Sequence, residues 1–293
     1  MKRKALIYII LAGIFWGTSG IFVKLLSPYG FVPLQFTAVR GTVAFIALSL
    51  YALIFDRSLF KIKRRELLYA VGVGLSIFGT ATLYFLSMQM TSISVAVVLM
   101  DTAPLYVMLF SVIFLKEKMN APKVISVAMM IVGCVLVSGI IGNAKFNMTG
   151  VLIGVLSGIC YGAYNILTKL AMKDGASAIS LNIYSFLFMA ALALAVCKPL
   201  GIIESAAKDI KITLPLLIGI GIVTFVLPYV LYALSMKSLP ATTVSALSIV
   251  EPMAATVFGI VLFREIPDAF GFVGIALIIA AIFILGKSEG KQE

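Results

Sequence analysis

The chain has 293 residues, of which 62% are hydrophobic and only 12% are charged, and its mean hydropathy is +1.14. These values exclude a disordered chain, which needs low hydrophobicity, and an ordinary soluble domain, which must cover itself with polar groups. The formal charge of +11 comes from basic residues in short runs between apolar stretches, with no basic aromatic module. We therefore expect contact with a lipid bilayer and no contact with nucleic acid.

Ten apolar stretches are long enough to cross a bilayer, and each should be a helix because an open strand cannot satisfy its backbone in lipid. The basic start followed by an apolar run is also typical of a signal peptide, but this run is long enough to span and recurs later in the chain. The ten expected spans are residues 5–26, 33–55, 66–87, 91–115, 121–140, 149–171, 178–197, 213–236, 240–263 and 268–286.

Charge counts at the ends of the spans predict the orientation. If the N-terminus is inside, 16 Lys and Arg residues face the cytoplasm and 6 face outward, while Arg40 lies within the second span. Because cytoplasmic loops are enriched in Lys and Arg, we expect a multi-pass protein of a bacterial-type inner cell membrane with both termini cytoplasmic.

An internal repeat divides the chain into two similar halves, because three blocks recur in the same order at offsets of 145 to 148 residues. The matches are residues 13–17 (GIFWG) with 158–162 (GICYG), residues 83–88 (LYFLSM) with 231–236 (LYALSM), and Pro104, Lys116 and Glu117 with Pro252, Arg264 and Glu265. We expect two five-span repeats, residues 1–142 and 143–293, with about three extra residues in the loop 198–212. Since five is odd, the second copy must enter from the opposite face, an inverted topology that places a site near mid-membrane.

Asp101, Glu251 and Arg40 are charged residues within expected spans. A charge at the helix centre costs about 2.5–3.5 kcal/mol on the insertion scale, so each must meet water, a partner or a substrate. The two carboxyl groups could bind a substrate ammonium, carry a coupling proton or form buried hydrogen bonds that position the helix. Arg40 could dock a substrate carboxylate, pair with Asp101 or act as a structural tie.

Pro104 and Pro252 follow these carboxyl groups at matching positions of spans four and nine. Proline cannot donate to the carbonyl four residues back, so the carbonyl groups of Met100 and Ser248 would be free. A kink with a free carbonyl at mid-depth suits a substrate amine or a hinge, and a simple packing kink is the alternative.

Trp16, Tyr84, Tyr161, Tyr232 and Asn165 are further candidates for substrate contact. Aromatic side chains with polar tips suit a cavity that holds an organic solute, although packing explains buried tyrosines equally well. Asn165 lies one turn beyond Tyr161 and so shares its helix face.

Charged residues near the span ends are gate candidates, namely Lys24, Lys169, Glu117 and Glu265. Snorkelling lysines and solvated ion pairs at the helix ends are the simpler interpretations. Glycines at every fourth position predict close helix contacts in spans one and six; they are Gly13, Gly17, Gly150, Gly154, Gly158 and Gly162.

No histidine is present, and the cysteines Cys134, Cys160 and Cys197 lie scattered in apolar segments without a CxxC pair. This removes His-based catalytic relays and most zinc, haem and copper sites, and there is no Walker-type phosphate loop. An intramembrane aspartyl protease would need two aspartates at depth, whereas only Asp101 lies there. We expect no metal, no cofactor and no enzymatic activity, with the cysteines as buried apolar side chains.

Taken together, these motifs resemble the EamA family of the drug/metabolite transporter superfamily. The marks are Trp16-Gly17, Arg40, the two Leu-Tyr-x-Leu-Ser-Met segments, Pro104 to Glu117, and Glu251-Pro252 to Glu265. The resemblance covers nearly the whole chain. It implies ten helices, cytoplasmic termini, no ATP, a central cavity lined mainly by spans 1, 3, 4, 6, 8 and 9, and movement of a small metabolite, often export of amino acids.

The sequence therefore predicts a secondary transporter or facilitator of a small amino acid or related zwitterionic or amine compound, working by alternating access. A coupling proton is a further candidate partner. Export of cationic drugs is the alternative, and a membrane scaffold or an intramembrane enzyme is a remote one. The oligomeric state, monomer or homodimer, stays open.

Overall fold

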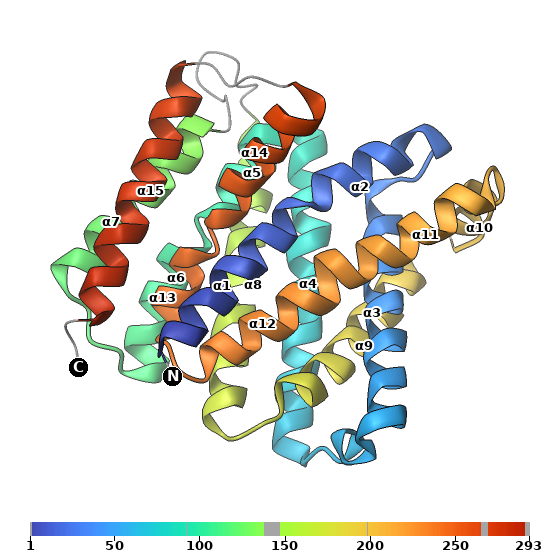
Figure 1. Ribbon diagram of the computed structural model, residues 1–293, viewed down its shortest axis with the longest axis horizontal. Helices are drawn as coiled ribbons and strands as arrows, with labels where there is room; N and C mark the ends of the chain where they lie inside the picture. The colour runs from blue at the N-terminus through green and yellow to red at the C-terminus, as the bar shows by residue number, and fades with distance from the viewer. Residues whose placement is uncertain (1, 92, 138–146, 198, 265–268, 291–293) are drawn as a thin grey trace.

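The computed structural model describes the chain except for residues 1, 92, 138–146, 198, 265–268 and 291–293, and every regular element in the described part is a helix (Figure 1). The helices of the first half are α1 (Lys2–Gly17), α2 (Ser19–Leu26), α3 (Pro33–Phe55), α4 (Arg64–Met90), α5 (Ile93–Asp101), α6 (Ala103–Phe110) and α7 (Ala121–Val137). Those of the second half are α8 (Met148–Lys173), α9 (Ala178–Val196), α10 (Pro199–Ala207), α11 (Ile210–Gly221), α12 (Leu227–Met236), α13 (Ala241–Leu247), α14 (Val250–Phe263) and α15 (Ala269–Gly290).

These helices account for the ten expected spans. Among the described residues, eight segments are long and apolar enough to cross a membrane, and two shorter apolar helices, Ala121–Leu136 and Ala269–Ile284, supply spans five and ten. Spans one, four, eight and nine each consist of two consecutive helices, and in span eight a π-helical turn, Ile222–Val226, lies between α11 and α12. The prediction of an all-α membrane protein with about ten helices is confirmed.

The segment between spans seven and eight differs from the predicted loop 198–212. It contains α10, and α11 begins at Ile210, three residues before the expected start of span eight. The hydroxyl of Thr213 donates to the carbonyl oxygens of Ala206 and Asp209, which ties the end of α10 to the start of α11. A side chain that satisfies the last carbonyl groups of one helix permits such a sharp junction between helices.

The two halves contact each other through equivalent residues. A Cβ placed on Gly13 or Gly17 would lie within 2.9 Å of Val250 or Ala254, so α1 packs closely on α14. In the other half, Gly158 packs against Thr102 and Gly162 against Tyr106. Each of these partners lies 148 residues before its counterpart, so the glycine seams are confirmed and the contacts are related by a twofold exchange of the halves.

A left-handed residue at the end of a broken span also repeats at the same spacing. Lys116 and Arg264 have positive φ angles of 55° and 57°, and each ends the second part of a broken span. A left-handed backbone is uncommon for residues other than glycine. Its occurrence at two positions 148 residues apart indicates that both halves end this span in the same way.

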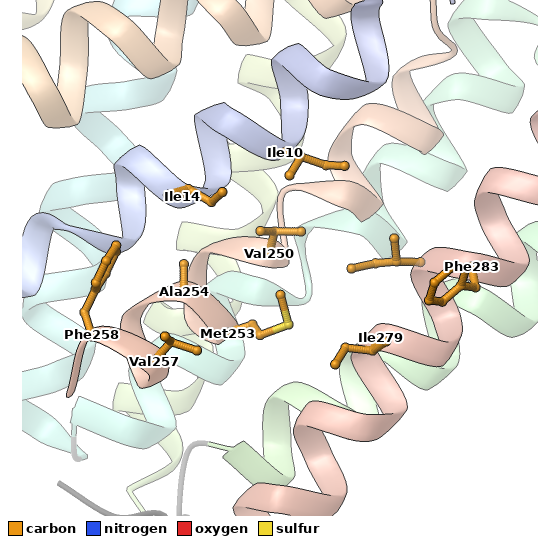
Figure 2. A pocket seen from close by; sticks show the side chains of 10 residues that line it. Ile10, Ile14, Val250, Met253, Ala254, Val257, Phe258, Ile279 and Phe283 are labelled. Atoms are coloured by element: carbon orange, nitrogen blue, oxygen red, sulfur yellow. The ribbon is translucent and has the colours of Figure 1, made fainter. Parts of the chain in front are cut away.

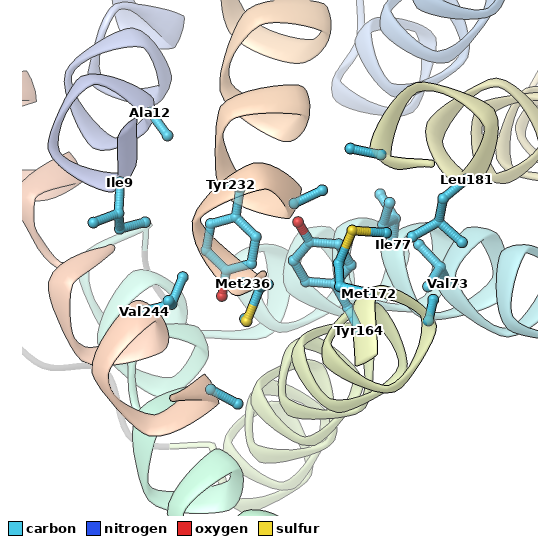
Figure 3. Packing of buried hydrophobic residues seen from close by; sticks show 14 of the residues in the cluster. Ile9, Ala12, Val73, Ile77, Tyr164, Met172, Leu181, Tyr232, Met236 and Val244 are labelled. Atoms are coloured by element: carbon cyan, nitrogen blue, oxygen red, sulfur yellow. The ribbon is translucent and has the colours of Figure 1, made fainter. Parts of the chain in front are cut away.

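Helix pairing follows the same exchange. α4 of the first half packs on α8 of the second half, and α12 of the second half packs in the same way on α1 of the first half. α3 pairs with α9, the equivalent helix of the other half, and α7 likewise pairs with α15 (Figure 1). The central core lies where α1, α4, α8, α9 and α12 meet, with the fully buried side chains of Tyr164, Tyr232 and Leu181 among its members (Figure 3). The expected boundary between repeats, at residues 142 and 143, lies outside the described residues.

Candidate functional site

The candidate site lies where spans four and nine are broken. α5 ends at Asp101 and α6 begins at Ala103, while α13 ends at Leu247 and α14 begins at Val250. Pro104 and Pro252 lie in the first turn of α6 and α14, a position that proline tolerates because its missing N–H is not needed there. Each proline therefore coincides with the start of a new helix within its span.

The backbone at the second break corrects one expectation. The Ser248 carbonyl, expected to be free, accepts a hydrogen bond of 2.9 Å from the Glu251 N–H. The N–H of Ile249 also bonds to the Ala246 carbonyl at 3.2 Å. These three-residue spacings show a tighter turn that satisfies the acceptor left by proline.

Charged residues of three spans lie near these breaks, each within electrostatic range of at least one of the others. The Glu251 carboxyl lies within electrostatic range of both Asp101 and Arg40. Among the described residues, the charged side chain within electrostatic range of Arg40 is that of Glu251, not that of Asp101. Asp101 instead accepts a hydrogen bond of 3.1 Å from the Cys134 thiol of α7, and both side chains are buried.

Three tyrosines surround the charges. Tyr84 is within electrostatic range of Asp101, Glu251 and Arg40, and Tyr229 is within range of Arg40 and Glu251. The Tyr161 hydroxyl donates to the Ser248 hydroxyl over 3.5 Å, next to the break in span nine. Arg40, Glu251 and all three tyrosines are only half-buried, so they retain surface toward accessible space.

Aromatic rings form one wall of this region. The Trp16 ring lies 5.3 Å from the rings of both Tyr229 and Tyr232, measured between centroids. Tyr164 lies 5.5 Å from Tyr229 and 5.4 Å from Tyr232. Edge-to-face and tilted geometries of this kind are favourable, so the wall is held firmly in place.

Asn165 and Tyr232 face each other inside that wall. The Tyr232 hydroxyl donates to the Asn165 side-chain oxygen, and both residues are fully buried. Figure 3 shows Tyr232 of α12 beside Tyr164 of α8 in the packed core. The hydrogen bond between Asn165 and Tyr232 stabilises the α8–α12 contact in this structure. Contact of either side chain with substrate stays a prediction.

Two gate candidates form contacts at one end of the molecule, which we call the Lys169 end; Lys169 bonds within the second half, whereas Glu117 joins the two halves. The Lys169 ammonium donates to the carbonyl oxygens of Met236 and Leu239 at 2.7 and 2.6 Å. The Glu117 carboxylate accepts from the Ala241 N–H at 2.7 Å and from the Thr242 hydroxyl at 2.6 Å. Glu117 thus caps the N-terminus of α13, the usual task of a residue within the same helix.

The opposite end, which we call the Lys24 end, is looser. At the Lys169 end, α13 is wholly buried and contacts α6. At the Lys24 end, residues 97–100 of the equivalent helix α5 are only half-buried, and α5 makes at most isolated contacts with α14 among the described residues. Lys24 is exposed, and Glu265 lies outside the described residues. The structure is therefore closed at the Lys169 end.

A separate apolar groove lies beside the site. It has a volume of about 450 Å³ and is lined only by apolar residues of α1, α14 and α15 (Figure 2). Val250 and Ala254, which line it, are the residues that contact Gly13 and Gly17. The groove therefore lies on a face of the α1–α14 contact that carries no charged residue.

Three site residues were missed by sequence reasoning. Tyr229 and Phe225 belong to span eight and lie near Arg40, and Cys134 was expected to be a purely apolar side chain. Pro228, next to Tyr229, was the signal that could have marked this segment. Nothing in the sequence pairs Cys134 with Asp101, because the contact joins helices that only the tertiary fold brings together.

Comparison with known proteins agrees with this architecture. A model of the EamA-like transporter family matches the chain twice, over residues 3–139 and 148–287. The uncharacterized transporter YwfM of Bacillus subtilis is 24% identical over 98% of this chain and 95% of its own length. The threonine/homoserine exporter RhtA of Salmonella typhimurium is 26% identical over 71% of this chain and 67% of its own.

A solved crystal structure has the same fold, with a TM-score of 0.82 over the whole of both chains at 18% identity. Since the family model covers nearly all of the chain, with one match in each half, the sequence resemblance is confirmed. The chain is a multi-pass membrane protein that belongs to the EamA-like transporter family.

Proposed function

We propose that this transporter exports a small amino acid, or a related zwitterionic or amine metabolite, across the cell membrane. The observation that carries the proposal is that carboxyl groups, a guanidinium and phenols from both halves lie within electrostatic range of one another near the two broken spans. A zwitterion offers a partner to each charge and offsets the cost of holding them in the membrane. The similarity to RhtA, named as a threonine/homoserine exporter, supports this substrate class.

Transport would proceed by alternating access between the two five-span repeats. With both termini cytoplasmic, the closed Lys169 end faces the cytoplasm and the looser Lys24 end faces outward. Loading of a cytoplasmic substrate then requires the contacts of Glu117 with α13, which cross between the repeats, to open. Because the halves contact each other through equivalent residues, the same type of closure can form at the other end.

The transport test uses the full chain reconstituted in liposomes. Efflux of L-threonine and L-homoserine should exceed that from empty liposomes, while a quaternary ammonium dye should not be carried. The proposal is wrong if the dye is carried and neither amino acid is. Export of cationic compounds, the second candidate, would then fit the two carboxyl groups better.

Proton coupling is tested by Asp101→Asn, which keeps the size of the side chain but removes its ability to ionise. We expect the variant to fold and bind substrate but to lose flux driven by a pH gradient. Asp56→Asn is the matched control, because Asp56 is exposed between α3 and α4. Unchanged pH-driven flux in Asp101→Asn would show that Asp101 does not carry the proton.

A further inference from the structure

Arg40 forms no ion pair with any residue that the structure describes. Its guanidinium stacks on the Phe225 ring at 4.9 Å from the ring centroid. Its Nε atom is buried and has no hydrogen-bond partner in the described part of the chain. Buried polar groups in native proteins are nearly always hydrogen-bonded, so an unpartnered donor of this kind needs an explanation.

The surroundings of Arg40 supply further donors. The tyrosines Tyr84 and Tyr229 are the phenols within its electrostatic range. Tyr229 follows a π-helical turn, a feature that is frequent at functional sites. The Asn182 amide of α9 donates to the Tyr229 carbonyl at 3.3 Å, which fixes the backbone that carries this phenol.

The charges nearby limit the ligand to a singly charged anion. Arg40 attracts an anion, but Glu251 lies within its range and Asp101 lies within range of Glu251. Two carboxyl groups would oppose a doubly charged phosphate, whereas a carboxylate that carries its own ammonium group can satisfy both signs. A guanidinium also matches the geometry of a carboxylate through two parallel hydrogen bonds.

We propose that Arg40, Tyr84 and Tyr229 form a carboxylate subsite, in which Arg40 binds the substrate carboxylate and the two phenols donate to it. This inference rests on the proposed function, and it assigns the carboxylate end of the substrate to spans two, three and eight. The ammonium end then faces Glu251. Compounds that lack a carboxylate leave the guanidinium unpaired and bind more weakly for that reason.

The structure offers a direct binding signal. Trp16 is the single tryptophan of the chain, and its ring lies 5.3 Å from that of Tyr229. Its fluorescence in the purified full-length protein can be titrated with L-threonine, with 3-hydroxybutyrate, which lacks the ammonium group, and with 1-aminopropan-2-ol, which lacks the carboxylate. We expect a response to the two carboxylates at concentrations at least about tenfold lower than to the amine.

Variants locate the subsite. Arg40→Gln should weaken binding of both carboxylates by about ten- to a hundredfold, Tyr229→Phe by a few fold, and Arg40→Lys should partly restore it. Arg57→Gln is the matched control, because Arg57 is exposed beyond the end of α3. Thermal unfolding of each variant, and the partial rescue by lysine, separate loss of binding from loss of fold.

The outcomes distinguish the two proposals. Equal binding of the amine and L-threonine, or unchanged affinity in folded Arg40→Gln, overturns the subsite while amino acid efflux from liposomes still supports the function. Binding of 3-hydroxybutyrate that depends on Arg40, without efflux of any amino acid, supports the subsite and contradicts the function. No response to either carboxylate overturns the subsite.

Discussion

Cys134 holds the carboxyl group that we propose as the proton carrier. Its thiol donates to Asp101 from α7, a helix packed mainly against α15 at the periphery of the molecule. A thiol is a weak donor, so it orients a carboxylate without satisfying it fully. In the proposed proton transfer, this bond would orient Asp101 while leaving its carboxyl group able to exchange a proton.

Substituting Cys134 tests this positioning role. Cys134→Ala removes the donor, and we expect it to lower pH-driven flux severalfold and to change the pH profile, whereas Cys134→Ser keeps a donor and retains most of the flux. Loss of one hydrogen bond to a charged group corresponds to about 1.5–3 kcal/mol, and the weaker thiol should lie at or below this range. Liposome flux at several pH values measures the effect.

The remaining cysteines serve as controls for that measurement. Cys160→Ala and Cys197→Ala should leave the pH profile unchanged, since neither thiol contacts a carboxyl group among the described residues. A pH profile for Cys134→Ala that matches the wild-type profile would reduce Cys134 to a packing residue.

At the level of helices, α13 depends on a capping group from the other half of the protein. Glu117 follows span four and satisfies the first N–H groups of α13 in span nine. The negative charge also interacts favourably with the positive end of the helix dipole. Such a cap stabilises only the conformation in which the Lys169 end is closed, because opening must separate the two segments.

Glu117→Ala should therefore shift the protein toward opening of the Lys169 end. An N-cap contributes about 1 kcal/mol, or roughly a fivefold change in population. A cysteine introduced at Val244 should react faster with a water-soluble maleimide in this background. Val244 is fully buried in the wild-type structure and is not one of the donors to Glu117, so its labelling rate reports the opening without disturbing the cap.

Glu66→Ala is the matched control for this experiment. Glu66 accepts from the Lys63 N–H at 3.2 Å and so caps α4 from within the same helix. Its loss should destabilise α4 without changing labelling at position 244. Equal labelling in both variants would mean that Glu117 acts on overall stability and not as a contact specific to the closed end.

For the whole molecule, the twofold exchange of the halves makes one decisive prediction about the membrane. Lys116 and Arg264 occupy equivalent positions, have nearly equal φ angles and are both exposed. If the repeats are inverted, single cysteines at these positions should be labelled from opposite sides of the membrane, with position 116 reachable from the cytoplasm. Impermeant reagents on intact cells and on inverted vesicles measure this.

Labelling of both positions from the same side would contradict the inverted arrangement and, with it, alternating access between the two repeats. A cysteine at Lys2 provides the reference for the cytoplasmic side, since the termini are proposed to face the cytoplasm. The result does not depend on the substrate, so it tests the architecture independently of the export proposal.

Several parts of the fold could be predicted because they depend on local sequence. A span requires only enough consecutive apolar residues, and a repeat can be recognised from matching letters at a constant offset. Gly158 and Gly162 could be placed in a helix contact because small residues at every fourth position permit only a few packing modes. The loop before span eight was predicted incorrectly, since the contacts of Thr213 that close α10 onto α11 have no sequence signature.

The sequence by itself determined the membrane class, the number of spans, the duplication and most of the polar residues near the broken helices, because each of these follows from composition, spacing or the cost of charge in lipid. Tertiary structure alone decided which of these residues meet. It placed Glu251 and not Asp101 beside Arg40, joined Cys134 to Asp101, brought Tyr229 to the site and closed the Lys169 end. The physical reason is that these contacts arise from packing between helices far apart in the chain, which no local pattern of the sequence specifies.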